Sequence, residues 1–264
     1  MTLHKAAEEG NLDVVRYWTE KDPSSFNTTI NYGLFPHIRA ATPLHISAER
    51  GHLDVVKYLI EKNPASVDIT DGGRKRTPLY WAAYQGHVEV IKYLVEEGGA
   101  DVSSMDVEGE TPLHIGAGHG DLEVVKYLAQ KNPAGVNITN NLGQTPLHVV
   151  AGPLYRGPHN VTKYLVEEGQ TDTTIKENLN GWTPLHLLAL RGWLDLVKYV
   201  AEKNPSEVNI KAQGGETPLD LVEIICLAED CSSVFTDDCR SCDSVVEFLK
   251  SLKILLHLRS KNKS

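Results

Sequence analysis

Histidine and cysteine are the residues of this chain whose types and spacing could do chemistry. Five of the 11 histidines stand at the fourth place of a recurring pattern, Thr-Pro-Leu-His or a close variant: His4, His45, His114, His148 and His186. Imidazole can act as a general base or bind a metal ion near neutral pH. Successive copies, however, belong to different structural units, roughly 10 Å apart if their helices pack at ordinary distances, whereas metal–nitrogen bonds measure about 2 Å. Tyr80 and Asp220 replace His in two copies. The pattern therefore predicts structural histidines, each holding the turn of its own unit through local hydrogen bonds.

The cysteines are the second candidate for chemistry. All four lie near the C-terminus with the spacing C-x4-C-x7-C-x2-C: Cys226, Cys231, Cys239 and Cys242. The last two could supply half of a zinc site, but the sequence contains no second C-x-x-C pair. A disulfide closing the intervening loop and free thiols in a reducing compartment are the alternatives to zinc. We predict free thiols, no metal site and no cofactor, with the other two readings left open.

No other motif indicates catalysis. The sequence contains no Walker-type phosphate loop, no His-Glu-x-x-His zinc motif and no nucleophile elbow. Its net charge of −9 argues against nucleic acids and anionic membranes as general partners, because both require a cationic surface. We therefore predict a protein that is not an enzyme and that binds neither nucleic acid nor membrane.

Targeting signals are also missing from the sequence as it stands. No basic segment followed by an apolar one opens the chain, and no apolar run approaches the ~20 residues that span a bilayer. These features predict an intracellular protein, in the cytoplasm or alternatively in the nucleus, and we expect a monomer.

The elements that carry the recurring pattern repeat along the chain. The pattern starts at Thr42, Thr77, Thr111, Thr145, Thr183 and Thr217, separated by 35, 34, 34, 38 and 34 residues, and a degenerate first copy starts at Thr2. A nearly constant period of this size indicates stacked structural repeats.

One unit, residues 110–139, shows what the pattern builds. Thr111 can cap a helix, Pro112 suits its first position, and Gly120 permits the left-handed conformation that ends it. A second helix with an apolar face follows, and Asn132-Pro133 ends it. Each unit is thus predicted as helix, turn, helix and loop. Neighbouring units must stack, because neither helix can bury its apolar face alone.

The segment DVEGETPLHIGAGHGDLEVVKYL, residues 106–128, resembles the ankyrin repeat, whose ~33-residue unit carries a Thr-Pro-Leu-His-x-Ala signature. The resemblance covers essentially residues 1–260. It implies paired helices with hairpin-like loops, called fingers here, that project from them. It also implies a concave face, formed by the inner helices and the fingertips, on which a protein partner binds.

From the repeat and the resemblance we predict an all-α, ankyrin-repeat solenoid of about seven helix-turn-helix units with projecting hairpin loops. Residues 1–228 would form the array, with units starting near residues 2, 42, 77, 111, 145, 183 and 217. Residues 229–264 would form the Cys-containing loop and a capping helix that completes the last repeat and begins at Asp243 or Ser244. Ile254 and Leu258 are surplus to the capping face and could instead contact a partner.

Residues that deviate between units are the candidate contacts, since packing constrains the residues that face neighbouring units. We predict partner contacts from the ends of the inner helices, the fingertips and two insertions: Tyr32, Phe35, Glu49, Arg50, Arg74, Arg76, Trp81, Tyr84, Gln85, Glu108, Glu110, His119, Gln144, Tyr155, Arg156, Trp182, Leu190 and Arg191. Trp182 is the strongest of them, because buried aromatic residues dominate interfaces, and its alternative is packing back on its own loop. Trp81 is expected to be partly buried and weaker.

Two units exceed the usual length. The first finger, residues 27–41, is six or seven residues longer than the others and contains apolar residues such as Tyr32 and Phe35. These would either shield the N-terminal end of the stack or contact a partner. In the fifth unit, residues 152–159 contain three extra residues, which should shorten the inner helix and project the side chains between its two prolines.

The predicted function is a non-enzymatic scaffold or adaptor that binds a protein partner through its concave face and fingers. A preorganised array loses little entropy on binding. The alternative is a targeting or effector subunit that recruits a catalytic partner, such as a ubiquitin ligase, to a client. That role needs a second docking surface, for which the C-terminal helix is the available segment.

Overall fold

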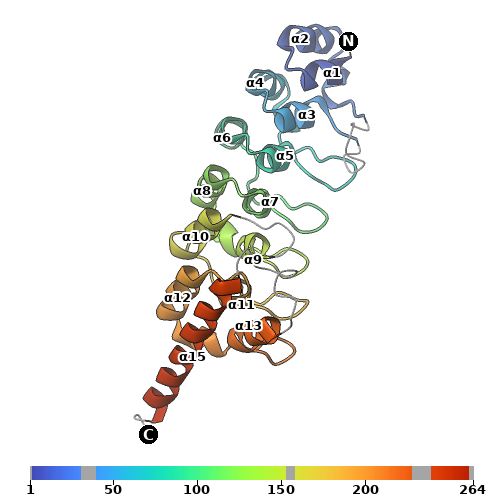
Figure 1. The fold of residues 1–264 in the computed structure, drawn as a ribbon. Helices are drawn as coiled ribbons and strands as arrows, with labels where there is room; N and C mark the ends of the chain where they lie inside the picture. Colours follow the sequence, from blue (N-terminus) through green and yellow to red (C-terminus); the bar gives the residue numbers. More distant parts are fainter. Residues whose placement is uncertain (1, 31–39, 153–157, 228–238, 262–264) are drawn as a thin grey trace. The chain divides into compact units, whose positions relative to one another are not determined.

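The computed structural model describes residues 2–30, 40–152, 158–227 and 239–261 of the chain. Contacts between Cα atoms divide it into two compact units, Met1–Gly135 (unit 1) and Val136–Ser264 (unit 2). Each unit is described by itself, and Figure 1 labels the helices of both.

Unit 1 is a stack of helix pairs (Figure 1). Its pairs, inner helix first, are α1 (Leu3–Glu8) with α2 (Leu12–Lys21), α3 (Pro43–Arg50) with α4 (Leu53–Lys62), α5 (Pro78–Gln85) with α6 (Val88–Glu96), and α7 (Pro112–His119) with α8 (Leu122–Lys131). Short 3-10 turns follow three outer helices, η1 (Pro23–Asn27), η2 (Pro64–Ser66) and η3 (Pro133–Asn137), the last of which spans the boundary of the unit. Inner helices pack on inner helices and outer on outer, so the apolar faces are buried between layers.

Unit 2 continues the same pattern. Its elements are α9 (Pro146–Ala151), α10 (His159–Glu167), α11 (Pro184–Leu190), α12 (Leu194–Lys203), η4 (Pro205–Asn209), α13 (Pro218–Leu227) and α15 (Cys239–Lys261). The inner helix α11 packs on both α9 and α13, and the outer helix α10 packs on α12. The predicted all-α repeat solenoid is confirmed by these two stacks.

The start and end of each inner helix follow from its sequence. In α7 the Oγ1 of Thr111 accepts the N–H of His114, and Pro112 occupies the first turn. Gly120 ends the helix at φ 83°, a left-handed conformation that favours glycine. As predicted, the inner helix of the fifth unit is shorter: α9 has six residues where α7 has eight, and its C-cap Gly152 is extended.

The recurring histidine makes the predicted local contact and a second one. In His45, Nδ1 accepts the N–H of Thr42 at 3.2 Å, and Nε2 lies 3.1 Å from the carbonyl oxygen of Arg76, in the finger of the next unit. His148 and His186 repeat both contacts with their own threonines and the next fingers. The prediction of a contact within one unit was therefore too narrow, because the imidazole also joins two units.

The C-terminal helix α15 begins at Cys239, four residues before the predicted start. The predicted cap at Asp243 or Ser244 is wrong, because no glycine or proline interrupts residues 239–244 and the helix extends through them. Val245 and Leu249 are buried where α15 packs on α11, α12 and α13. The predicted array boundary at residues 228 and 229 stays a prediction.

Several predicted features lie outside the described residues. The side chains of all four cysteines and of Leu258 belong to this group, as does most of the long first finger. The base of that finger is described, where Ile30 and Ala41 pair as an antiparallel bridge.

The described ranges lack a membrane-spanning helix and a cluster of metal-binding side chains. None of their helices is long and apolar enough to cross a membrane. No group of three or more His, Cys, Asp or Glu side chains in them could hold a metal ion.

Candidate partner-binding surface

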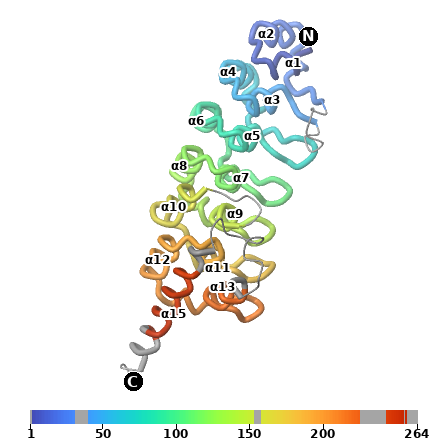
Figure 2. Tube along the Cα trace, viewed as in Figure 1, coloured from blue at the N-terminus to red at the C-terminus, as the bar shows by residue number. Residues whose placement is uncertain are grey.

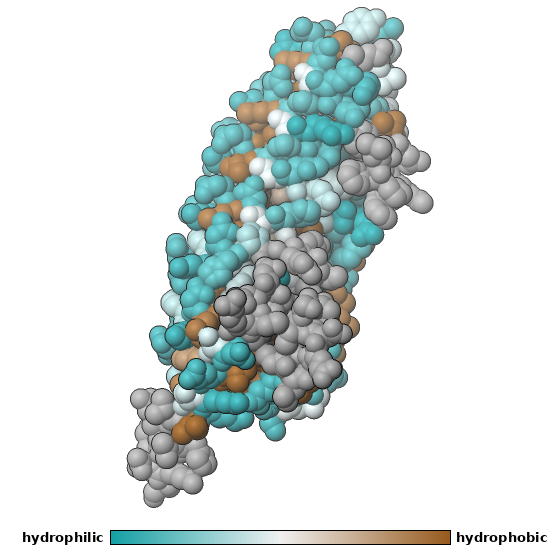
Figure 3. All heavy atoms as spheres, viewed as in Figure 1, coloured by the Kyte–Doolittle hydropathy of each residue, from teal (hydrophilic) through white to brown (hydrophobic). Residues whose placement is uncertain are grey.

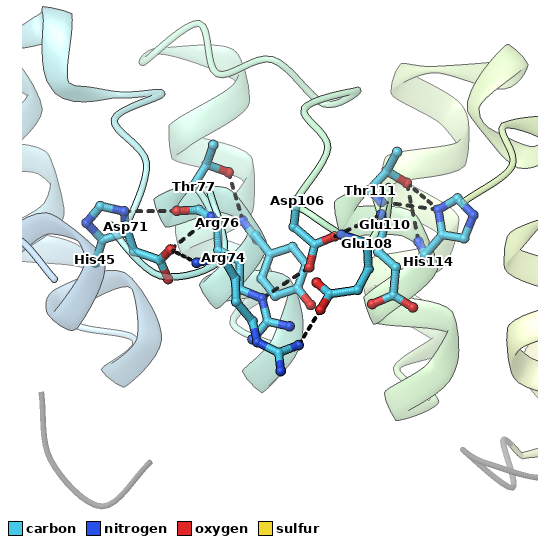
Figure 4. Close-up of polar contacts among 11 residues, drawn as sticks. His45, Asp71, Arg74, Arg76, Thr77, Asp106, Glu108, Glu110, Thr111 and His114 are labelled. Carbon is cyan, nitrogen blue, oxygen red and sulfur yellow. Dashed lines mark hydrogen bonds and ion pairs between the residues drawn. The ribbon is translucent and has the colours of Figure 1, made fainter. Parts of the chain in front are cut away.

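The predicted contact residues of unit 1 gather in two clusters. The finger cluster belongs to the loops that precede α5 and α7 and consists of Asp71, Arg74, Arg76, Asp106, Glu108 and Glu110 (Figure 4). The helix-end cluster belongs to the inner helices α1, α3, α5 and α7 and consists of Trp81, in the middle of α5, and of residues in the last turns: Glu8, Glu49, Arg50, Tyr84, Gln85 and His119. Figure 2 shows the fingers projecting from the row of inner helices.

The finger before α7 is held by its own backbone. The N–H of Asp106 donates to the carbonyl of Glu110 at 3.0 Å, and Asp106 Oδ1 accepts the N–H groups of Glu108 and Glu110. Gly109 makes the tight turn at φ 76°. One backbone bond joins neighbouring fingers, from the N–H of Val107 to the carbonyl of Arg74 at 2.9 Å. The finger side chains therefore stand on a fixed frame.

Two arginines of the finger before α5 pair with carboxylates of the next finger. Arg76 Nε lies 3.2 Å from Asp106 Oδ2, with side chains 11% and 0% exposed. Arg74 lies 2.6 Å from Glu108 Oε1 at a more exposed position. Asp71 makes the same contacts in its own finger as Asp106 makes in the next one, because Asp71 Oδ1 accepts the N–H groups of Arg74 and Arg76.

Glu110 differs from the other two carboxylates. It is 9% exposed, and no described residue forms a hydrogen bond or ion pair with its side-chain carboxylate. Burial raises the pKa of the Glu110 carboxyl to about 7, and the negative charge of Asp106 adds to the shift. Burial, then the contact with Asp106, also raises the pKa of Glu108. Burial and the neighbouring Asp106 carboxylate thus disfavour the negative charge of both Glu108 and Glu110.

Aromatic rings connect the finger cluster to the helix-end cluster. The guanidinium of Arg76 lies over the rings of Tyr80 and Trp81, at 4.5 and 5.3 Å from the centroids. The Trp81 ring lies 5.6 Å from Tyr84, and the Tyr84 ring 4.1 Å from His119. These contacts run from the fingers along α5 to the end of α7.

Polar side chains link the ends of three inner helices, α1, α3 and α5. Gln85 Nε2 donates to Glu49 Oε1 at 2.8 Å, Arg50 Nε lies 3.1 Å from Glu49 Oε2, and Arg50 reaches Glu8 at 3.2 Å. Together with the ring of Tyr84 against His119, this chain joins α1, α3, α5 and α7 in a continuous preordered strip.

The predicted residues of unit 2 are spread over two elements. Gln144 and Trp182 are half-buried at the fingertips before α9 and α11, and the Trp182 carbonyl accepts from His148. The guanidinium of Arg191, after α11, lies 4.6 Å from the ring centroid of Trp193. Because Trp182 has intermediate exposure, neither a partner contact nor packing on its own loop is favoured.

Four predicted contact residues are buried. Glu49, Trp81, Glu110 and Leu190 have at most 9% of their surface exposed. Glu49 contacts Gln85 and Arg50, and Trp81 and Leu190 are packed between helices. These side chains offer little surface to a partner, and their role as contacts stays a prediction. Trp81, at 4%, is more buried than the partial burial that we predicted.

Four other predicted residues cannot be placed. They lie outside the described ranges: Tyr32, Phe35, Tyr155 and Arg156.

The sequence reasoning missed some members of the surface. Asp106 was not among the predicted contacts, although its carboxylate pairs with Arg76. Trp193 was overlooked, and its position in the turn before the outer helix is occupied by His52, His87 and Asp121 in earlier units. Comparing that turn between units, as was done for the fingers, would have found it.

The face of unit 1 seen in Figure 3 is mostly hydrophilic. Apolar residues show there as separate spots between charged and polar ones, within the part that is coloured. A partner on this side would meet mostly polar groups with separate apolar spots between them.

Comparison with known proteins agrees with this architecture. Three segments of the chain, residues 3–106, 98–177 and 152–222, match the family described as ankyrin repeats (3 copies). A curated ankyrin repeat-containing protein of Schizosaccharomyces pombe is 32% identical over 81 residues, which cover 27% of this chain and 39% of that protein. The aligned region therefore spans well under half of the relative. Ankyrin repeats are protein–protein interaction modules. With matched segments that run from residue 3 to residue 222, the chain belongs to the ankyrin-repeat family.

Proposed function

We propose that this chain is a non-enzymatic scaffold or adaptor that binds a protein partner through the inner-helix face and fingers of unit 1, inside the cell. The observation that carries the proposal is the continuous strip along the ends of the inner helices, on which Tyr84 lies against His119 and Gln85 against Glu49. The strip combines aromatic rings with charged groups, the composition that supplies most binding energy at protein interfaces.

Preorganisation supports the same proposal. Tyr84 and Gln85 are already held against His119 and Glu49 on neighbouring helices. Side chains ordered before binding lose little rotamer freedom when a partner arrives, whereas each flexible side chain costs about 1 kcal/mol. The resemblance to ankyrin repeats, which implies a concave face formed by the inner helices and the fingertips, supports the same choice of face.

The test compares two tyrosines on different rows of helices. Tyr84, on the inner helix α5, and Tyr127, on the outer helix α8, are both half-buried. The wild-type chain, Tyr84→Ser and Tyr127→Ser would each capture proteins from cell extract, with the captured proteins quantified by mass spectrometry. Matching thermal melts would exclude unfolding as the cause of any loss.

We expect a set of proteins that the wild type and Tyr127→Ser retain equally and that Tyr84→Ser loses. A hot-spot truncation of about 2 kcal/mol lowers affinity roughly 30-fold. Equal capture by both variants would contradict a binding surface at Tyr84.

A further inference from the structure

Unit 2 contains a cavity of about 290 Å³ between α10, α12, η4 and the loop that follows α10. Its apolar wall is formed by Val166, Tyr199 and Val200, and its polar wall includes Thr171, Thr173 and Glu207. None of the predicted partner contacts that the structure describes lines this cavity. It is therefore a feature separate from the candidate surface.

Glu207 is a buried residue of this cavity with one unused oxygen. The side chain is 1% exposed. Its Oε1 accepts the hydroxyl of Thr173 at 2.6 Å and Nδ2–H of Asn204 at 2.9 Å. Its Oε2 is buried and has no hydrogen-bond partner among the described residues. A buried acceptor without a donor costs stability, so its presence calls for a reason.

An earlier unit builds the corresponding loop with apolar side chains. Asp101 and Asp172 hold equivalent places, because Oδ1 of each accepts the N–H and the hydroxyl of the residue two positions further on. With the loops aligned on these residues, Ala100 and Val102 stand where the cavity has its two threonines. The stack therefore does not require threonine hydroxyl groups in this loop.

The 3-10 turns show the same for the carboxylate. Glu207 is the third residue of η4, and the third residues of η1, η2 and η3 are Ser25, Ser66 and Gly135. A small residue thus serves this place in three other turns. The carboxylate of Glu207 is an addition that the repeat does not need.

The charges near Glu207 do not compensate it. Within the described residues, Asp172 is the charged group that acts on the Glu207 carboxyl, and it is negative. Lys203 also lines the cavity, but it is exposed and its Nζ lies 5.6 Å from the ring centroid of Tyr199. Burial raises the pKa of the Glu207 carboxyl. The cavity therefore combines an uncompensated acceptor with an apolar wall.

We propose that this cavity binds a small alkylammonium group, with Glu207 as the receptor for the charged head and the apolar wall against the hydrocarbon chain. An ammonium brings three donors and one positive charge. The terminal torsion of a glutamate side chain is soft, so rotation of the carboxyl can turn either oxygen towards the ligand. The face of Tyr199 offers the cation a further favourable contact.

The size and the donor set of the cavity narrow the ligand. Its volume of about 290 Å³ lies near the lower end of the range for ligand pockets, which restricts the ligand to a few carbon atoms. A metal ion does not fit the donor set, because no group of three or more His, Cys, Asp or Glu side chains in the described ranges could hold one.

The experiment uses the full chain and butylammonium chloride as the probe. Isotope-labelled protein would be titrated with this salt, with sodium chloride at matched ionic strength and with 1-butanol, while the amide NMR signals of Thr171, Thr173 and Glu207 are followed. We expect saturable shifts from butylammonium with a dissociation constant of roughly 1–10 mM, a range open to so small a ligand. Sodium chloride should give no such shifts, and butanol should bind at least about tenfold more weakly.

A capped Gly-Lys-Gly peptide distinguishes two sources of the alkylammonium group. Butylammonium binding without peptide binding would identify the ligand as a free amine. Tighter binding of the peptide would identify it as a lysine side chain of another protein. Both results support an alkylammonium site.

Three variants locate the response. Glu207→Gln keeps the shape of the side chain, and Glu207→Ser reproduces Ser66 at the equivalent place, so both should fold. Each should weaken butylammonium binding roughly tenfold or more. Glu202→Gln, which alters an exposed carboxylate on α12, should leave binding unchanged. Thermal melts of all three would show that they are folded.

Equal binding of butanol and butylammonium, or unchanged binding in both Glu207 variants, would overturn the proposal. The absence of saturable shifts below about 100 mM butylammonium would also overturn it, leaving Glu207 as a structural link to Thr173 and Asn204. None of these outcomes depends on capture through Tyr84, so the proposed function is tested separately.

Discussion

His45 shows why histidine suits the fourth position of the recurring pattern. Nδ1 of His45 accepts the N–H of Thr42, while Nε2 lies against a carbonyl oxygen and must donate to it. Only the neutral imidazole with its proton on Nε2 satisfies both contacts. Asp220 preserves half of the arrangement, since its Oδ2 accepts the N–H and hydroxyl of Thr217, whereas Tyr80 preserves neither. The recurring histidine therefore acts by holding hydrogen-bonding groups in place, and the array tolerates its replacement in single units.

At Glu110 the residue-scale prediction concerns stability. A carboxyl whose pKa is raised in the folded state, here from 4.5 to about 7, contributes stability that is complete below pH 4.5 and lost as the pH rises through 7. Glu110→Gln does not titrate. We expect it to be no more stable than wild type at pH 5 and more stable by roughly 1–3 kcal/mol at pH 8.

The measurement is urea unfolding at both pH values, followed through amide signals of α5 and α7. The histidines titrate in both proteins and cancel in the difference. A wild-type-to-variant difference that is the same at pH 5 and pH 8 would show that Glu110 does not titrate in this range.

At the scale of elements, α15 binds its unit through one apolar edge and two charged contacts. Val245 and Leu249 are buried against neighbouring helices. Lys250 lies 2.6 Å from Glu223, and Lys253 lies 3.9 Å from Asp220, both on α13. Exposed pairs of this kind contribute little, so the apolar edge should hold the helix in place.

Substitutions of Leu249 and Ile254 test whether the apolar edge holds α15 in place. Leu249 is 1% exposed and Ile254 is 61% exposed on the same helix. We expect Leu249→Ala to destabilise unit 2 by about 2–4 kcal/mol, because truncating a buried leucine leaves a cavity. Ile254→Ala should change stability by at most about 0.5 kcal/mol. Chemical denaturation of both variants gives the comparison, and equal effects would mean that α15 does not cap the stack through Leu249.

At the scale of the whole molecule, the linking histidines make both units sensitive to acid. Burial lowers the pKa of His45, His148 and His186 to about 4. A depressed histidine pKa contributes stability that is complete above the unfolded value of 6.5 and lost as the pH falls from 6.5 towards 4. At pH 5 each histidine should cost about 2 kcal/mol relative to pH 7.5.

The double variant His148→Asn/His186→Asn tests this in unit 2. Asparagine has the shape of Asp220, which accepts the threonine N–H at the same place, and it does not titrate. The variant should be less stable than wild type at pH 7.5 but should lose less stability between pH 6.5 and pH 5. Thermal melts over this range would show it, with His159→Asn as the exposed-histidine control. If the stability of the double variant fell as steeply with decreasing pH as that of the wild type, the acid sensitivity could not be assigned to His148 and His186.

Much of the fold could be predicted from local signals. The capping threonines, Pro112 at a first turn and Gly120 at a helix end act where the sequence placed them. These residues work within one turn of chain, so their effect does not depend on distant partners. The start of α15 was predicted four residues too late, because Asp243 or Ser244 was taken as its cap although no glycine or proline in residues 239–244 stops the helix.

The candidate surface could be predicted only in part. Variation between units pointed to the fingers and the inner-helix ends, and Arg76, Tyr84 and His119 lie in one series of contacting side chains. That a partner binds there stays a prediction. The variation did not separate exposed residues from buried ones, so Glu49, Trp81 and Leu190 were included with them.

By itself the sequence determined the repeat, its period and the helix boundaries of most units, because those depend on caps, turns and apolar spacing within about 34 residues. Only the tertiary structure decided which charges are paired. Arg76 meets Asp106 and Arg74 meets Glu108 across neighbouring fingers, whereas Glu110, only two residues further along, is left without a partner. Pairing and burial depend on groups that lie a whole repeat away in the sequence. Stacking brings these groups within 4 Å of each other, and no local sequence pattern predicts which of them meet.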